Sequence, residues 1–133
     1  MADLASFFEI EAVEVGRREA DSSTFLLHTD IGTTIKLVYR FWLLRGPDGI
    51  TIVDTGVEEN EARKRGTHGI TPITRALSER GVDPENVQNV ILTHLHWDQG
   101  CSVFHLVRNN PYSSIFCAGR PYPRAMSANW TTA

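Results

Sequence analysis

The sequence VILTHLHWDQ, residues 90–99, joins an apolar run to two histidines and an aspartate at alternate positions. If the apolar run is a β-strand, residues two apart project from one face, so His94 and His96 point the same way. Asp98 follows just past the strand end and can turn back toward them. Imidazole nitrogens with a carboxylate oxygen are typical zinc ligands, and they suit iron, cobalt or manganese less selectively. The stretch therefore predicts a metal site where a strand meets its loop, the usual ligand crevice of open α/β sheets.

The overall composition is that of an ordinary globular chain. Its 133 residues, 41% hydrophobic and 22% charged, suggest one domain or part of a larger one. A formal net charge of -3 favours neither nucleic acid nor an anionic membrane as a partner. The first residues show no basic and apolar signal segment, and no apolar run reaches transmembrane length. We therefore expect a cytoplasmic protein in which Cys101 and Cys117 are free thiols.

The N-terminal residues predict β-structure. Alternation of apolar and acidic residues from Phe8 onward indicates a half-buried strand with a bulge near residues 12–13. A polar turn is expected at 16–23, a short strand at 24–27 and another turn at 30–32.

A hairpin follows in the pattern. The apolar run 37–44 is rich in β-branched and aromatic residues, which indicates a strand covered on both faces. The turn residues 46–49 then return the chain into a strand at 50–54. These two strands should pair antiparallel.

The segment before the histidines predicts helical structure. Residues 58–69 are charged and at best partly helical. A clear helix opens at Thr71 as N-cap with Pro72 as its first residue, and Gly81 ends it. Its apolar positions, spaced i, i+3 and i+4, form one buried face made of Ile73, Ala76 and Leu77.

The remaining elements lie around and beyond the histidine motif. We expect a strand at 87–93, which carries the motif, and a short strand at 114–118. Residues 119–133 should be irregular, because Pro121 and Pro123 forbid a regular helix there. A helix followed by a buried strand indicates that the β-rich start leads into a β-α-β arrangement.

Set beside each other, IVDTG (52–56) and ILTHLHWD (91–98) resemble the metallo-β-lactamase superfamily, and within it the N-acyl homoserine lactonase-like hydrolases. The resemblance covers residues 39–98 well and the tail faintly. It implies an α/β (α+β) fold, the N-terminal half of an αββα sandwich in which a mixed β-sheet carries helices on its outer face. Because the family's later ligands would lie beyond Ala133, we expect residues 1–133 to form a single partial domain without its C-terminal half.

The resemblance also implies roles for individual residues. His94 and His96 would bind the first metal ion, and Asp98 would bind the second and is the candidate catalytic residue. Asp54 would stand behind these ligands and orient them by hydrogen bonds. An Asp that bonds its own backbone in a turn is an equally open reading of Asp54. Gln99 occupies the place of the motif's last histidine, and its amide is a poor zinc ligand, so we expect it beside the site and the second metal weakened.

The implied activity is that of a zinc-dependent hydrolase holding one or two Zn²⁺ ions or other divalent transition metals. A metal-activated water would attack the lactone or ester-type carbonyl of a small-molecule substrate. The inner face of the half-sandwich would be apolar, which predicts a homodimer or pairing with the missing C-terminal half.

Two alternatives stay open at the sequence level. The chain could be a metal-binding fragment without catalytic activity, which the Gln99 substitution favours. The tripeptide Asp54-Thr55-Gly56 also matches the signature of dimeric aspartic proteases, in which two such aspartates share a proton. That reading leaves the 71–81 helix and the histidine motif without a role.

Overall fold

The computed structural model of the chain describes residues 7–27, 30–94, 114–117 and 120–121. These residues form one six-stranded sheet whose spatial order follows the sequence. The first two pairs of neighbours are antiparallel, the next two are parallel and the last is antiparallel. The strands are β1 (Glu9–Asp21), β2 (Thr34–Gly46), β3 (Gly49–Val53), β4 (Val87–Leu92), β5 (Ser114–Cys117) and β6 (Arg120–Pro121). The expected mixed β-sheet is thereby confirmed.

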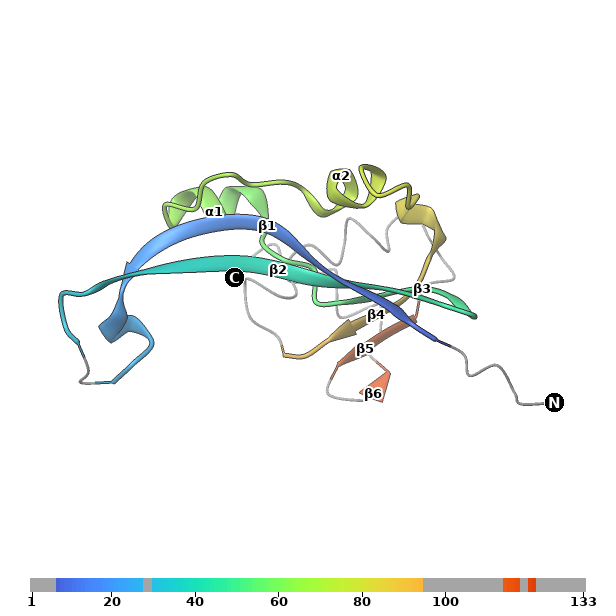
Figure 1. The fold of residues 1–133 in the computed structure, drawn as a ribbon, viewed down its shortest axis with the longest axis horizontal. Coiled ribbons are helices and arrows are strands. Elements are labelled where there is room, and N and C mark those ends of the chain that lie inside the picture. The colour runs from blue at the N-terminus through green and yellow to red at the C-terminus, as the bar shows by residue number, and fades with distance from the viewer. Residues whose placement is uncertain (1–6, 28–29, 95–113, 118–119, 122–133) are drawn as a thin grey trace.

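Both α-helices cover the same face of this sheet (Figure 1). Helices α1 (Glu59–Lys64) and α2 (Ile73–Ser78) lie between β3 and β4 in the chain, together with the short 3₁₀ turn η2 (Pro84–Asn86). They form the crossover that parallel strands require. Among the described residues, no helix is both long enough and apolar enough to cross a membrane.

The hydrophobic core lies between the sheet and the two helices. Every second residue of the central strands points into it, as the two-residue period of a strand requires. Its largest fully buried side chain is Phe41, and truncating such a residue to alanine removes about 3–5 kcal/mol of stability. The sheet contributes Val13, Val15, Phe41, Leu43, Ile52, Val90, Leu92 and Ile115, and the helices contribute Ala62, Ile73, Ala76 and Leu77.

Most predicted elements around the motif are confirmed. The strand expected at 87–93 is β4, and the hairpin expected at 37–54 is the antiparallel β2–β3 pair. The charged 58–69 segment contains α1, and β5 lies within the strand expected at 114–118. Irregular structure was predicted for 119–133, but Arg120–Pro121 pair with β5 instead. Proline is tolerated there because a sheet edge leaves its missing N–H unneeded. The other residues of that range lie outside the described part.

The prediction for the N-terminal hairpin was wrong in three respects. β1 runs unbroken to Asp21 through the segment expected as a turn, and its bulge lies between Glu14 and Gly16. Pairing along the whole of β2 holds these polar residues in the strand, which overrides their turn-like composition. No strand forms at 24–27. The chain turns there through η1 (Ser22–Thr24), whose N-cap Asp21 accepts hydrogen bonds from the backbone N–H groups of Ser23 and Gly32, both at 2.8 Å.

The predicted start of α2 was wrong, whereas its predicted end is confirmed. Thr71 is not the N-cap, because the first helical hydrogen bond runs from the N–H of Ala76 to the carbonyl of Pro72 at 2.9 Å. The N–H of Thr71 donates instead to the carbonyl of Val15 at 3.1 Å. The glycine at the other end is confirmed. Gly81 has φ +71° and its N–H donates to Ser78, while the N–H of Val82 donates to Leu77. These two bonds form a Schellman motif, which satisfies the last helical carbonyls.

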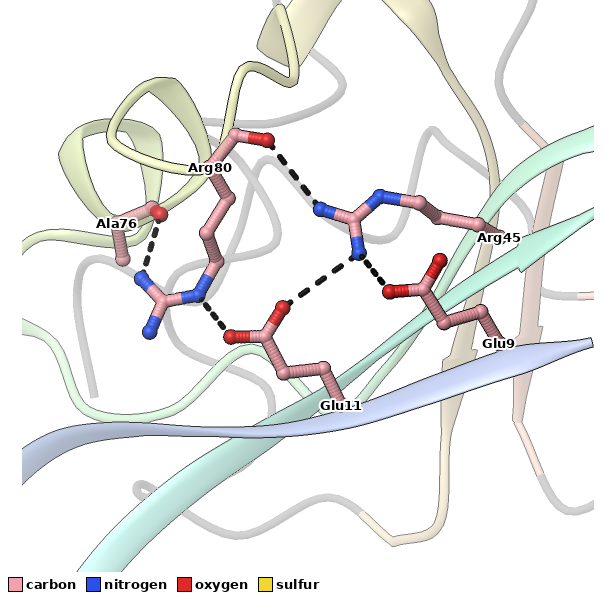
Figure 2. A network of polar contacts seen from close by, with 5 residues as sticks. All are labelled: Glu9, Glu11, Arg45, Ala76 and Arg80. Carbon is pink, nitrogen blue, oxygen red and sulfur yellow. Dashed lines mark hydrogen bonds and ion pairs between the residues drawn. The ribbon is translucent and has the colours of Figure 1, made fainter.

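A charged network ties the end of α2 to the sheet (Figure 2). Arg80 Nε donates to Glu11 Oε1 at 2.6 Å and Arg80 Nη1 donates to the carbonyl of Ala76 at 2.9 Å. Arg45 Nη1 lies 3.3 Å from Glu9 Oε1 and 3.5 Å from Glu11 Oε2, and Arg45 Nη2 donates to the carbonyl of Arg80 at 3.2 Å. The hydrogen bond from Arg80, aided by Arg45, lowers the pKa of Glu11 below its usual value. The network fixes the helix layer over β1 and β2.

The face of the sheet opposite the helices carries an apolar row that is partly open. A row of side chains crosses it in register from β1 to β5: Ala12, Trp42, Val53, Ile91 and Phe116. Trp42 in the centre of this row is 45% exposed. The prediction that the 37–44 strand is covered on both faces was therefore wrong, because only its odd-numbered residues face the helices.

Candidate functional site

The parallel pairing of β3 and β4 brings their carboxyl ends to the same edge of the sheet. Val53 pairs with Ile91, and the N–H of Asp54 continues the ladder to the carbonyl of Ile91 at 2.8 Å. The first residues after each strand, Asp54 and Thr93, therefore leave the sheet side by side. They are separated by 39 positions in the sequence.

Asp54 turns its carboxylate across to the end of β4. Its φ is +59°, a left-handed backbone that Asp adopts more readily than most residues. The backbone N–H of Thr93 donates to Oδ1 at 2.9 Å, and the Thr93 hydroxyl lies 3.0 Å from Oδ1 and 2.9 Å from Oδ2. Of the two readings that the sequence left open, these bonds match a carboxylate that acts on the motif strand. They run to Thr93 and not to the backbone of Asp54 itself.

The turn after β3 is held close against β1. Thr55 is buried, and Gly56 follows with φ +68°. A Cβ on Gly56 would lie 2.5 Å from Cγ2 of Val15, well inside contact distance. Because Gly56 has no side chain, the turn that begins at Asp54 can lie close against Val15 in the core.

His94 is the one predicted metal ligand within the described residues. It directly follows Thr93, its side chain is exposed, and its Nδ1 lies 3.0 Å from the Thr93 hydroxyl. His96, Asp98 and Gln99 lie outside the described residues, so their convergence on one ion stays a prediction. In the part that the structure describes, no three His, Cys, Asp or Glu side chains gather closely enough to hold a metal.

Comparison with known families agrees with this arrangement of strands and residues. The family model described as the metallo-beta-lactamase superfamily matches residues 38–131. The chain belongs to this superfamily. The match spans both Asp54 and the whole 94–99 motif, which is the pair of segments that carried the resemblance in the sequence.

Solved structures similar to this superfamily member include several lactonases. A quorum-quenching N-acyl homoserine lactone lactonase is 25% identical, with a TM-score of 0.62, over 71% of this chain and 40% of that one. A point variant of AiiA from B. thuringiensis with N-decanoyl-L-homoserine bound at its active site is 23% identical, with a TM-score of 0.65, over 80% and 46%. An N-acyl homoserine lactone hydrolase with N-hexanoyl-L-homoserine at its catalytic metal centre is 24% identical, with a TM-score of 0.61, over 74% and 45%. The chain thus spans less than half the length of each. A comparison with curated protein sequences found no match.

One described residue at this edge, His94, is of a type that binds divalent metals. An exposed imidazole stands at the strand exit, and behind it a hydroxyl and a carboxylate are in hydrogen-bonding contact. Such an outer layer of acceptors is what metal-binding histidines require to fix their ring orientation. An imidazole is a donor that suits a divalent transition metal, and the other residues of the predicted ligand set lie outside the described part of the chain.

Thr93 is the site residue to which the sequence assigned no role. Its position as the last residue before His94 was visible, but a threonine at a strand end carries no distinctive signal. The parallel register of β3 and β4 makes it the neighbour of Asp54, and that register is a property of the fold.

Proposed function

We propose that this chain carries the first metal-ligand segment of a metal-dependent hydrolase that opens lactone or ester-type carbonyls. The observation that supports this most is the contact of the Asp54 carboxylate with Thr93, directly before His94. It sets a supported imidazole at the carboxyl ends of two parallel strands. A quorum-quenching lactonase 25% identical to the chain supports the substrate class.

In this proposal His94, His96 and Asp98 hold the metal, with Asp98 also acting in catalysis. Asp54 supports His94 from behind, and Gln99 lies beside the site in place of a ligand. Zn²⁺ is the expected ion, in one or two copies, because imidazole and carboxylate donors suit it. When bound, such an ion lowers the pKa of a coordinated water and polarises a carbonyl. The partner is a small molecule in a cytoplasmic setting.

A second candidate is metal binding without turnover. Gln99 stands where the motif has histidine, and the chain spans 40–46% of the lactonases to which it is similar. A single partial domain with so few donors would hold an ion without completing the catalytic centre. Homodimerisation, or pairing with a C-terminal half, would use the open sheet face around Trp42.

The aspartic protease reading is not retained. The chain belongs to the metallo-beta-lactamase superfamily. The Asp54 carboxylate is engaged by Thr93 of the same sheet, whereas a protease dyad would set it against a second aspartate.

Metal content and turnover together test the proposal. The purified chain should contain zinc by elemental analysis, and it should hydrolyse members of a lactone and ester panel in a reaction that a chelator stops. Metal without hydrolysis would favour the second candidate. A chain that takes up no transition metal from a zinc, cobalt or manganese solution would contradict both.

A further inference from the structure

The Thr93 hydroxyl lies between two groups that make different demands on its single proton. It is 2.9–3.0 Å from both carboxylate oxygens of Asp54 and 3.0 Å from Nδ1 of His94. A carboxylate can only accept hydrogen bonds, whereas a neutral imidazole nitrogen either donates or accepts according to its tautomer. The position of the single hydroxyl proton therefore decides which group donates in the contact with Asp54 and which donates in the contact with His94.

The hydroxyl proton must point at Asp54. If it pointed at His94 instead, the lone pairs of Oγ1 would face both carboxylate oxygens at hydrogen-bonding distance without a proton between them. The carboxylate cannot turn away, because the backbone N–H of Thr93 also holds Oδ1 at 2.9 Å. With its proton committed to Asp54, Oγ1 can only accept from the ring of His94.

We propose that Thr93 is a positioning residue whose hydroxyl, held by Asp54, keeps His94 in the tautomer with the proton on Nδ1. Nε2 is then the ring nitrogen that carries the lone pair for a metal. The connection to the metal rests on the proposed function, whereas the tautomer is argued from the contacts among Asp54, Thr93 and His94. A carboxylate that acts on a metal-binding histidine commonly does so directly. Here a hydroxyl stands between them.

The tautomer can be measured on the metal-free chain. In the ¹⁵N-labelled protein at about pH 8, the ring nitrogen shifts report which nitrogen carries the proton. A H94N variant assigns the signals. We expect the Nδ1–H form to predominate in the unmodified chain and in T93S, which keeps the hydroxyl. T93V removes it at nearly constant shape and should move the equilibrium toward the Nε2–H form.

Thr51→Val is the matched control. Thr51 also bridges β3 and β4 through its hydroxyl, which accepts from Asn89 Nδ2 at 3.3 Å. Its replacement removes a contact between the same two strands without touching His94, so the His94 tautomer should not change. Zinc affinity, measured by competition with a chromophoric chelator, should fall by about 10–100-fold in T93V and stay near the original value in T93S and T51V.

Two results would overturn the proposal. One is an unmodified chain in which His94 is mainly the Nε2–H tautomer, a measurement that needs no variant to fold. The other is a folded T93V variant whose His94 tautomer matches the unmodified chain. Tautomers as expected in a chain that binds no zinc would leave the role of Thr93 intact and contradict the proposed function instead.

Discussion

Two residues with left-handed backbone bracket the turn that starts the site. Asp54 and Gly56 have φ values of +59° and +68° and lie on either side of the buried Thr55. Non-glycine residues adopt this conformation at a cost of roughly 1–2 kcal/mol unless local bonds favour it. At Asp54 the backbone N–H and the hydroxyl of Thr93 donate those bonds, so conformation and site geometry depend on each other.

Two replacements of Asp54 should distinguish the contribution of its carboxylate charge from that of its left-handed backbone. Asn tolerates left-handed backbone and keeps one acceptor, so D54N should lower the free energy of unfolding by only about 1 kcal/mol. D54A loses both bonds and adds backbone strain, which together should remove about 2–4 kcal/mol. Urea unfolding of the metal-free variants measures both values. Equal stability of D54A and D54N would contradict the geometry described for this turn.

Gly56 should be intolerant of a side chain because of Val15. The Cβ of G56A would lie 2.5 Å from Val15 Cγ2, so strain and overpacking together should remove about 2–4 kcal/mol. Gly66 is the matched control, since it has φ +72° and nothing within 4 Å of an added Cβ, so G66A reports the backbone strain alone.

A double-mutant cycle isolates the clash at Gly56. In V15A/G56A the colliding methyl group is absent, and the loss of stability should be smaller than the sum of the single losses by more than about 0.5 kcal/mol. Simple additivity in thermal or urea unfolding would show that Val15 is not the obstacle.

At this scale the sequence predicted the residues that chemistry makes distinctive. The alternation of His94 and His96 and the strand-end position of Asp54 were visible without a structure. Thr93 was not, because its role depends on which strand lies beside β4. The geometry of His96 and Asp98 lies outside the described residues and stays a prediction.

Among the elements, α2 depends on charge as well as on its apolar face. The helix has six residues and contacts the sheet through Ile73, Ala76 and Leu77. Isolated helices this short are unstable in water, so tertiary contacts must hold it. The bond from Arg80 to Glu11 supplies one of these contacts at the end of α2.

Stability should therefore fall in acid partly through Glu11. Its pKa is lowered in the folded chain, first by the hydrogen bond from Arg80. The unfolded state then binds more protons, so this contribution is present above the ordinary value of 4.5 and is lost as pH falls through the lower folded value. Unfolding measured between about pH 7 and 3 should show a shallower acid loss in E11Q, with at most about 1 kcal/mol lost at neutral pH because the pair is partly exposed.

Glu14 provides the control for that prediction. It lies on the same strand, and its partner Arg17 is also on β1, so this pair does not reach α2. Hydrogen exchange of the α2 amides should accelerate in E11Q and stay unchanged in E14Q. Equal protection of α2 in the two variants would mean that the charged network does not hold the helix.

The elements that the sequence predicted well are those with an unambiguous local signal. The β2–β3 hairpin has its turn residues, α2 has its apolar face and Gly81, and β4 has its apolar run. β1 was predicted poorly because its second half is polar and is held by pairing with β2. The N-cap of α2 is Pro72, one residue beyond the predicted Thr71, and the N–H of Thr71 bonds to β1.

Over the whole molecule, the two faces of the sheet have different environments. One face is closed by α1 and α2, and the other carries the row through Trp42, a residue that is 45% exposed. The sequence predicted an apolar inner face from the resemblance to a sandwich, and this row agrees with that expectation. Composition alone could not assign it, because both faces of β2 are apolar and only the position of the helices distinguishes them.

Metal binding at the site should raise the free energy of unfolding of the whole chain. A ligand that binds only the folded state stabilises it by RT ln(1 + [L]/Kd), about 2.7 kcal/mol when the free metal is 100 times Kd. Zinc added to the metal-free chain should therefore raise the unfolding midpoint, and a chelator should reverse the change.

The variant H94A should abolish this shift of the unfolding midpoint. H68A should keep it, because His68 is an exposed histidine whose backbone alone pairs with Arg17, so that alanine preserves those bonds. If the two variants respond alike to zinc, the ion binds unfolded or surface histidines in general, and the strand exit after β4 is not its site.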